Sequence, residues 1–306
     1  MEGYTRTDLA EECLQGRAKT ISGVEQRERQ VGSVRVLDVR VKTAAAAKEI
    51  GKPMGRYVTL ECGRIDRLTA DASESMARLI AGELRGMTEA ICGRKPDASL
   101  EVLVIGLGNA ELTADAIGPD TVRRLTATRH LRSFEAALFH SLGCSSVSLL
   151  APGVLGQTGI EVQELLKGAV ERVKPHLVVV LDALAARDCD RLAATVQLSD
   201  TGIVPGSGVG NRRSALNRET LGVPVLSLGV PTVVDSATLV YDALCKAGIG
   251  EIPESLRAVL ENGRSFFVSL KESDQVTEKI AELLARAIGL AFTDALTESN
   301  CHIRRS

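Results

Sequence analysis

The sequence lacks several features that mark large classes of protein. It contains no uninterrupted apolar run of the roughly 18 residues that a membrane-spanning helix needs. Near the N-terminus, Glu2, Asp8, Glu11 and Glu12 interrupt any apolar segment of the kind found in secretory signals, so we expect the protein to remain in the cytoplasm. The net charge of −2 creates no broad field that would attract nucleic acid or an anionic membrane.

Common metal and nucleophile motifs are also absent. The 7 cysteines have no CxxC spacing, which favours reduced thiols over a disulfide framework or a zinc ribbon. The chain has neither the HExxH motif of zincins nor the GxSxG motif of serine hydrolases. A GLGN segment at 106–109 resembles the start of a dinucleotide-binding fingerprint, but Glu111 replaces its third glycine. We interpret GLGN as a tight turn whose backbone N–H groups can serve as an oxyanion site, and we expect no cofactor and no resident metal.

The chain does contain apolar runs that alternate with segments of helical spacing. The runs are 101–106, 145–153, 176–186 and 223–231, and two further strands are expected around 34–41 and 57–60. Helical spacing covers 72–91, with Asp71 as a plausible N-cap, and 274–290. This alternation predicts an α/β fold in one domain: a mainly parallel twisted sheet flanked by helices.

Two aspartates follow strands of that predicted sheet. Asp115 lies nine residues beyond the glycine that ends the run 101–106, and Asp182 directly follows the apolar residues 178–181. On neighbouring strands both carboxylates would reach one rim, where a shared proton lets one act as base and the other as acid. A structural interpretation is also open, with Asp182 as a helix N-cap and Asp115 as a loop carboxylate that accepts backbone hydrogen bonds.

Several longer motifs resemble the germination protease family. They are GLGNAELTADAIGP (106–119), APGVLGQTGIE (151–161), LDALAAR (181–187), SDTGIVPGSGVGNRR (199–213) and LGVPVLSLGVPTVVD (221–235). The resemblance implies an α/β fold related to the hydrogenase-maturation endopeptidases, usually a homotetramer. It also implies an endopeptidase of an unusual aspartic type, acting in the forespore and spore core on small acid-soluble spore proteins during germination.

The resemblance further implies roles for particular residues. The two essential aspartates of the family match Asp115 and Asp182. The family cleaves after an acidic residue, before a hydrophobic residue followed by alanine, and Asp8, Leu9 and Ala10 have that pattern. Self-cleavage between Asp8 and Leu9 would divide the chain into a propeptide, 1–8, and an endopeptidase domain, 9–306.

Three residues are expected to contact the substrate. Arg212 and Arg213 end the glycine-rich loop 199–213 and could pair with acidic substrate side chains, although a mobile surface loop is an equally open interpretation. Asn109 is the third of these residues, at the end of GLGN.

Two other functions compete with the protease hypothesis. A metal-dependent maturation endopeptidase needs a histidine well after its second acidic ligand, and the sequence has none between Asp182 and His302. A non-catalytic binding module would use the same carboxylates to hold a cation or a structural water.

Overall fold

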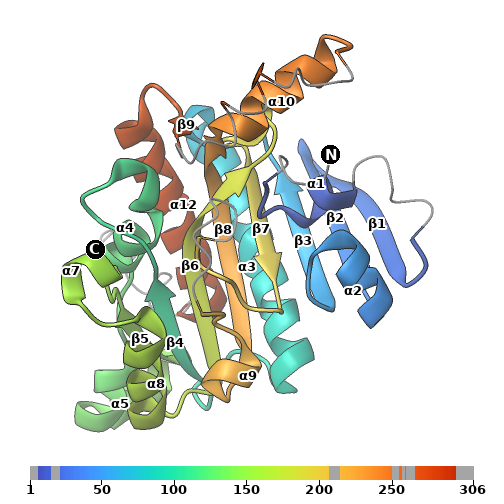
Figure 1. Cartoon of the computed structure of the whole chain (residues 1–306). Coiled ribbons are helices and arrows are strands. Elements are labelled where there is room, and N and C mark those ends of the chain that lie inside the picture. Colours follow the sequence, from blue (N-terminus) through green and yellow to red (C-terminus); the bar gives the residue numbers. More distant parts are fainter. Residues whose placement is uncertain are drawn as a thin grey trace.

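The structure is a computed structural model and describes residues 6–14, 21–206, 214–249, 255–256, 259 and 266–293. Within these residues one sheet of nine strands runs through the molecule, in the order β1-β2-β3-β7-β8-β6-β4-β5, and β9 pairs with β8 (Figure 1). The strands are β1 (Val24–Val31), β2 (Val34–Val41), β3 (Gly55–Glu61), β4 (Glu101–Gly106), β5 (Ser146–Leu150), β6 (Leu177–Ala186), β7 (Thr195–Ser199), β8 (Val225–Asp235) and β9 (Phe267–Ser269).

The parallel part of the sheet consists of β5, β4, β6 and β8. These are the four apolar runs expected from the sequence, and β6 and β8 are buried along almost their whole length. A strand covered on both faces has to be apolar throughout, which is why these runs do not alternate with polar residues. The expected α/β fold is confirmed.

An antiparallel extension widens the sheet beyond this parallel part. It consists of β7, β3, β2 and β1, each antiparallel to the next, with β7 antiparallel to β8. Strands β2 and β3 match the expected apolar segments. Strands β1 and β7 were not expected, because β1 is a largely exposed, charged strand and β7 has only 5 residues.

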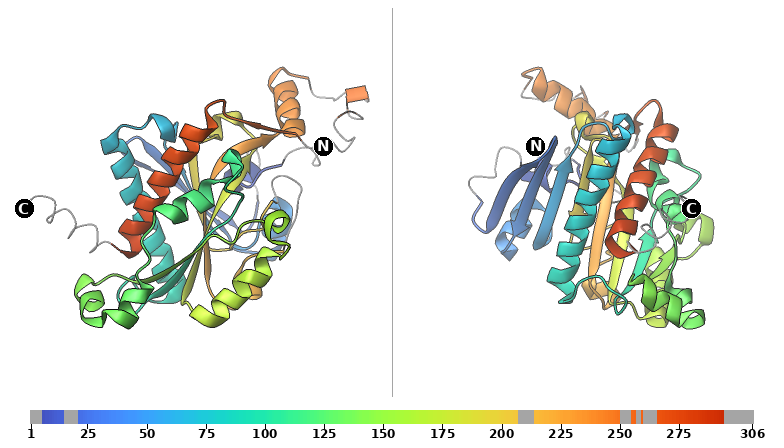
Figure 2. Two further views of the ribbon diagram at one scale, coloured as in Figure 1. Left: turned by 90° about the vertical axis from the view of Figure 1, so that its left-hand side faces the viewer. Right: turned by 180° about the vertical axis from the view of Figure 1, so that it is seen from behind.

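Helices cover both faces of the sheet (Figure 2). On one face, α3 (Ala70–Cys92), α4 (Ile117–Arg124) and α12 (Ser273–Phe292) enclose the largest apolar core. On the other face lie α8 (Val162–Val173), α9 (Arg218–Leu221), α1 (Ala10–Leu14) and α2 (Ala44–Ile50). The remaining α-helices are α5 (Arg129–Phe134), α6 (Ala136–Leu142), α7 (Leu155–Thr158) and α10 (Ser236–Lys246).

Two helices expected from the sequence are present with small shifts at their ends. Helix α3 begins earlier than expected, and its N-cap is Thr69, whose side chain accepts a hydrogen bond from the backbone N of Ala72, rather than Asp71. Helix α12 extends slightly beyond the expected range at both ends. Among the described helices, none is both long enough and apolar enough to cross a membrane.

Candidate active site

The turn after β4 positions Asp115. Strand β4 ends at Gly106, and the chain returns through a 3₁₀ turn, Thr113–Asp115, before α4 begins. Gly108 has φ +113°, and a Cβ atom there would lie 2.0 Å from the main-chain oxygen of Asp115. The backbone N of Asn109 donates a hydrogen bond of 2.7 Å to Asp115 Oδ2. GLGN is therefore the expected tight turn, but the Asn109 N–H group binds the Asp115 carboxylate.

This close approach predicts that Gly108→Ala displaces Asp115. We expect the variant to be destabilised by about 1–3 kcal/mol, since an L-residue is strained at this φ, and to lose activity as the carboxylate moves. Chemical unfolding and a peptide-cleavage assay measure both effects. Gly86→Ala is the matched control, because Gly86 lies within α3 with open space around it and should be slightly stabilised. Equal stability and activity of the two variants would contradict the role given to Gly108.

Asp182 lies inside β6 and is only 7% exposed. Its Oδ1 accepts a hydrogen bond of 3.0 Å from the backbone N of Ala183. Since β6 continues to Ala186, the interpretation of Asp182 as a helix N-cap is wrong. Asp182 stands opposite Gly229 of β8, which stands opposite Gln197 of β7. Residues opposite each other on paired strands share a face of the sheet, so Asp182, Gly229 and Gln197 lie on one face. A Cβ atom at Gly229 would lie 2.6 Å from Leu184 Cγ, so the Leu184 side chain packs closely against this glycine.

Asp115 and Asp182 line one cavity of about 620 Å³. Asp115 lies in the turn that follows β4 and Asp182 lies in β6, and β4 and β6 are adjacent parallel strands. The backbone N of Leu107, directly after β4, donates to the Leu181 oxygen at 2.8 Å. The structure thus brings the two predicted carboxylates to the same cavity at the carboxyl ends of the strands, where open α/β sheets bind ligands. Asp8, the acid of the expected self-cleavage site, lines this cavity as well.

The N-terminal segment lies along the end of β6. The backbone N of Asp8 donates to the oxygen of Ala185 at 2.9 Å, and Asp8 Oδ2 accepts from the backbone N of Ala185 at 2.9 Å. Leu9 is fully buried in an apolar pocket formed by Leu184, Ala186, Leu192 and Val234. Ala10 is also fully buried and packs against apolar side chains of β2 and α2. The chain on both sides of the Asp8–Leu9 bond is therefore held in place.

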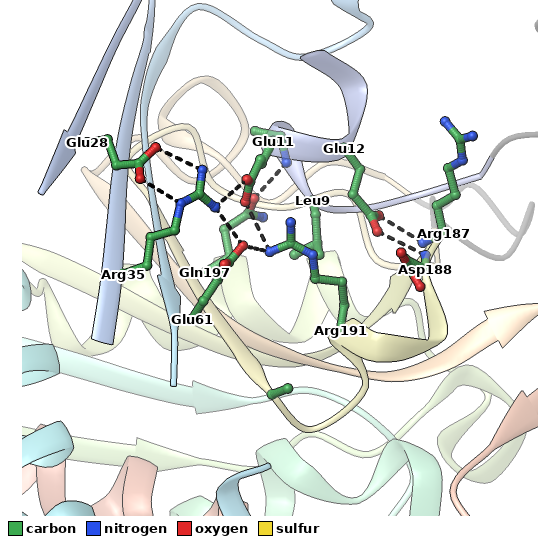
Figure 3. Close-up of polar contacts among 12 residues, drawn as sticks. Leu9, Glu11, Glu12, Glu28, Arg35, Glu61, Arg187, Asp188, Arg191 and Gln197 are labelled. Atoms are coloured by element: carbon green, nitrogen blue, oxygen red, sulfur yellow. Dashed lines mark hydrogen bonds and ion pairs between the residues drawn. The ribbon is translucent and has the colours of Figure 1, made fainter. Parts of the chain in front are cut away.

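Ionic contacts fix the helix that follows this segment (Figure 3). Glu11 lies between two guanidinium groups, at 2.8 Å from Arg35 and 3.1 Å from Arg191. Glu12 accepts backbone hydrogen bonds from Arg187 at 2.8 Å and Asp188 at 2.9 Å, directly after β6 ends. Because carboxylates bound by several donors hold their geometry well, α1 keeps the preceding peptide at the end of β6.

Asp8 also lines a second cavity, of about 630 Å³, whose lining includes Lys52, Gln197 and Cys13. Sequence motifs did not single out Lys52 or Gln197, because their relation to Asp8 arises only when distant segments meet. Burial raises the pKa of the Cys13 thiol, which keeps it neutral near pH 7 and unsuited to act as a nucleophile.

The remaining predicted contacts have different outcomes. Arg212 and Arg213 lie outside the described residues. The Asn109 side chain accepts hydrogen bonds from Gln157 Nε2 at 2.8 Å and from the Glu111 backbone N at 3.0 Å, so it braces the turn before Asp115. A direct contact of Asn109 with substrate stays a prediction. Among the described residues, no group of three or more His, Cys, Asp or Glu side chains is arranged to hold a metal ion.

Comparison with known proteins gives consistent matches over most of the chain. The family model described as germination protease matches residues 5–246. The germination protease of Caldanaerobacter subterraneus subsp. tengcongensis is 39% identical over 317 residues, covering 96% of this chain and 95% of that protein. The germination protease of Bacillus subtilis strain 168 is 43% identical over 246 residues, covering 78% of this chain and 66% of that protein. A solved NiFe hydrogenase maturation protease, HycI from Thermococcus kodakarensis KOD1, aligns with a TM-score of 0.34 and 18% identity, over 63% of this chain and 93% of that one.

Proposed function

Because this chain belongs to the germination protease family, we propose that it is an aspartic endopeptidase that begins the degradation of small acid-soluble spore proteins when a spore germinates. Asp115 and Asp182 are its catalytic residues. The observation that carries the proposal is that both carboxylates and Asp8 line a single cavity.

The two carboxylates supply complementary chemistry. In the proposed reaction one carboxyl group holds a proton while the other is charged, as in carboxylate pairs that share a site. The charged group removes a proton from a water molecule as it attacks the peptide carbonyl, and the protonated group donates to the leaving amine. No bound cofactor enters this scheme.

Contacts of the N-terminal segment support a preference for an acid, then an apolar residue, then alanine. The Asp8 carboxylate is bound by the backbone N–H of Ala185, and Leu9 fills a closed apolar pocket. Ala10 is fully buried, which leaves little room for a larger side chain. A substrate bound in the same place would need an acid in the position of Asp8, an apolar side chain in the position of Leu9 and a small side chain in the position of Ala10.

We infer that the chain is a zymogen that cleaves itself between Asp8 and Leu9. Residues 1–8 then form the propeptide and 9–306 the endopeptidase domain. The network around Glu11 and Glu12 favours slow self-cleavage, since it restrains the chain beside the bond. The proposal extends to a homotetramer in the forespore and spore core that acts on the protein component of DNA-bound substrates without binding nucleic acid.

A peptide-cleavage assay tests this function. A synthetic peptide containing Glu-Ile-Ala should be cut after its glutamate, with the site identified by mass spectrometry. A matched peptide containing Glu-Lys-Ala should be cut at least about tenfold more slowly, because an ammonium group would be buried in the pocket that holds Leu9. Equal cleavage of the two peptides, or cleavage at another bond, would contradict the proposed specificity.

Arg212 and Arg213 are proposed to contribute to the selection of acidic substrates. Charge reversal of both, to glutamate, should lower kcat/KM by about tenfold for substrates rich in acidic residues, since attractive pairs become repulsive. Competition between an acidic and a neutral peptide in one reaction measures the preference. An unchanged ratio would remove these arginines from the substrate site.

A further inference from the structure

Two donors converge on the main-chain oxygen of Asp8. Lys52 Nζ lies 2.9 Å from this oxygen, and Gln197 Nε2 lies 3.0 Å from it. Both distances are those of good hydrogen bonds, and the lysine bond is charge-assisted. This oxygen belongs to the peptide bond that joins Asp8 to Leu9, the bond assigned above to self-cleavage.

The fold holds Gln197 in a defined orientation. It lies on β7, opposite Gly229 of β8, which in turn stands opposite Asp182 of β6. The residue is 8% exposed, and Figure 3 shows it near Leu9. While Nε2 donates to Asp8, Oε1 accepts from the backbone N of Ala10 at 2.7 Å. One amide thus spans Leu9, from the carbonyl of Asp8 to the N–H group of Ala10. The orientation of the amide is fixed because the Asp8 oxygen needs a donor and the Ala10 N–H needs an acceptor.

Lys52 reaches the same oxygen from another element. It follows α2, where Gly51 ends the helix in the left-handed conformation with φ 70°, and its backbone N donates to Ala47 at 3.2 Å. Its Nζ also donates to the oxygen of Thr7 at 3.2 Å. The lysine head group therefore lies over two consecutive carbonyls, with the shorter contact on Asp8.

We propose that Lys52 and Gln197 form the oxyanion site of this enzyme, an inference that rests on the proposed cleavage between Asp8 and Leu9. When water attacks the Asp8 carbonyl carbon, a C–O bond forms and the π electron pair moves to the carbonyl oxygen, where the ammonium and the amide stabilise the charge. The electron pair on the oxygen then re-forms the C=O double bond as the C–N bond breaks. The proton removed from water replaces the proton given to the Leu9 nitrogen, so the immediate products are an α-carboxylic acid at Asp8 and an amine at Leu9. Transfer of the acid proton to the amine then gives an α-carboxylate and an ammonium group.

The Asp8–Leu9 peptide lies beside both cavities, which is consistent with acid–base catalysis from one side and stabilisation of the oxyanion from the other. Asp8 borders the cavity with Asp115 and Asp182 and also the cavity with Lys52 and Gln197. The carboxylates can therefore handle the water and the leaving amine, while the donors hold the oxygen. A substrate bound where residues 6–10 lie would meet the same two donors.

A purely structural role makes a different prediction. If Lys52 and Gln197 only fix the N-terminal segment, their loss weakens binding, which raises KM and leaves kcat unchanged. Donors to a developing oxyanion act in the transition state, so their loss lowers kcat. Cleavage of a separate Glu-Ile-Ala peptide distinguishes the two roles.

The experiment compares Lys52→Met, Lys52→Arg and Gln197→Glu with the wild-type full-length chain. We expect Lys52→Met and Gln197→Glu to lower the rate of release of residues 1–8 from the full-length chain by about 10²-fold. In chains begun at Leu9, the same substitutions should lower kcat on the peptide by about 10²-fold, with KM changed less than threefold. Lys52→Arg should recover much of the rate, since it keeps a cationic donor. Lys48→Met, at an exposed site on α2, should behave as wild type.

The hydrogen bond from Lys52 to the Asp8 carbonyl can also be measured directly, without any cleavage reaction. Asp-Leu occurs once in the sequence, so 13C at aspartate carbonyls combined with 15N at leucine selects the Asp8 carbonyl signal by NMR. In an Asp115→Asn background, Lys52→Met should shift that signal upfield as a hydrogen bond is lost, whereas Lys48→Met should not.

Each outcome decides one claim. Wild-type rates in Lys52→Met and Gln197→Glu, a rise in KM with kcat unchanged, or an unmoved Asp8 signal would overturn the oxyanion site and leave the proposed protease standing. Failure of the wild-type chain both to release residues 1–8 and to cut the peptide would instead overturn the proposed function, and the oxyanion site with it.

Discussion

Asp115→Asn and Asp182→Asn are each expected to lower peptide cleavage by at least about 10³-fold, because each removes one member of an acid–base pair. Both variants should still fold. An asparagine at 115 keeps an oxygen that accepts from the backbone N of Asn109, and one at 182 keeps an acceptor for the Ala183 N–H. Rates are measured on a Glu-Ile-Ala peptide, and thermal unfolding monitors the fold.

Asp120→Asn is the matched control for this pair. Asp120 lies in the first turn of α4, shortly after Asp115, but pairs with Arg123 on the surface. Its replacement should leave the rate within about twofold, as for surface changes away from a site. A parallel reaction with EDTA tests the metal-dependent alternative, and we expect no loss of rate. Retained activity in either purified asparagine variant would show that the two carboxylates are not the catalytic pair.

Asp8→Ala is expected to slow removal of the N-terminal segment by at least about 10³-fold. The substitution deletes the carboxylate that accepts from the backbone N of Ala185, and sites built around a polar group reject analogues that lack it by large factors. Asp8→Glu should restore cleavage, since an acid is again present. Intact-mass spectrometry of the incubated chains measures the remaining uncut fraction.

The same substitution separates processing from catalysis. A chain begun at Leu9 lacks Asp8 altogether and should cleave the Glu-Ile-Ala peptide as well as the processed wild-type protein does. If Asp8→Ala loses residues 1–8 at the normal rate, the acid is not recognised at this bond. If the chain begun at Leu9 is inactive, residues 1–8 are needed for more than holding the zymogen.

The parallel half of the fold could be predicted from the sequence, and the antiparallel half only in part. Strands β4, β6 and β8 are buried on both faces, so their apolar runs are continuous and easily recognised. Strand β1 contains VEQRERQV and is exposed along nearly its whole length, so no core imposes an apolar pattern on it. Strand β7 is buried but reads TVQLS, with polar residues at alternate positions, one of which, Gln197, contacts the N-terminal segment.

For the candidate site, sequence reasoning identified residues at strand ends but not those that depend on distant pairing. Asp115 and Asp182 were expected at one rim if their strands were neighbours; β4 and β6 are adjacent in the sheet, and both residues line one cavity. Gln197 lies 189 positions from Asp8 in the sequence, and their contact requires β7 to pair with β8 opposite Gly229. No spacing rule connects such residues, because the connection is made by the sheet register.

The most direct test of the central claim is the intact mass and N-terminal sequence of the purified full-length chain after incubation, beside its Asp182→Asn variant. We predict that the wild-type chain loses residues 1–8 and begins at Leu9, while the variant keeps its original N-terminus. A variant that also begins at Leu9, or a wild-type chain cut at a different bond, would contradict the assignment of the carboxylate pair to the Asp8–Leu9 bond.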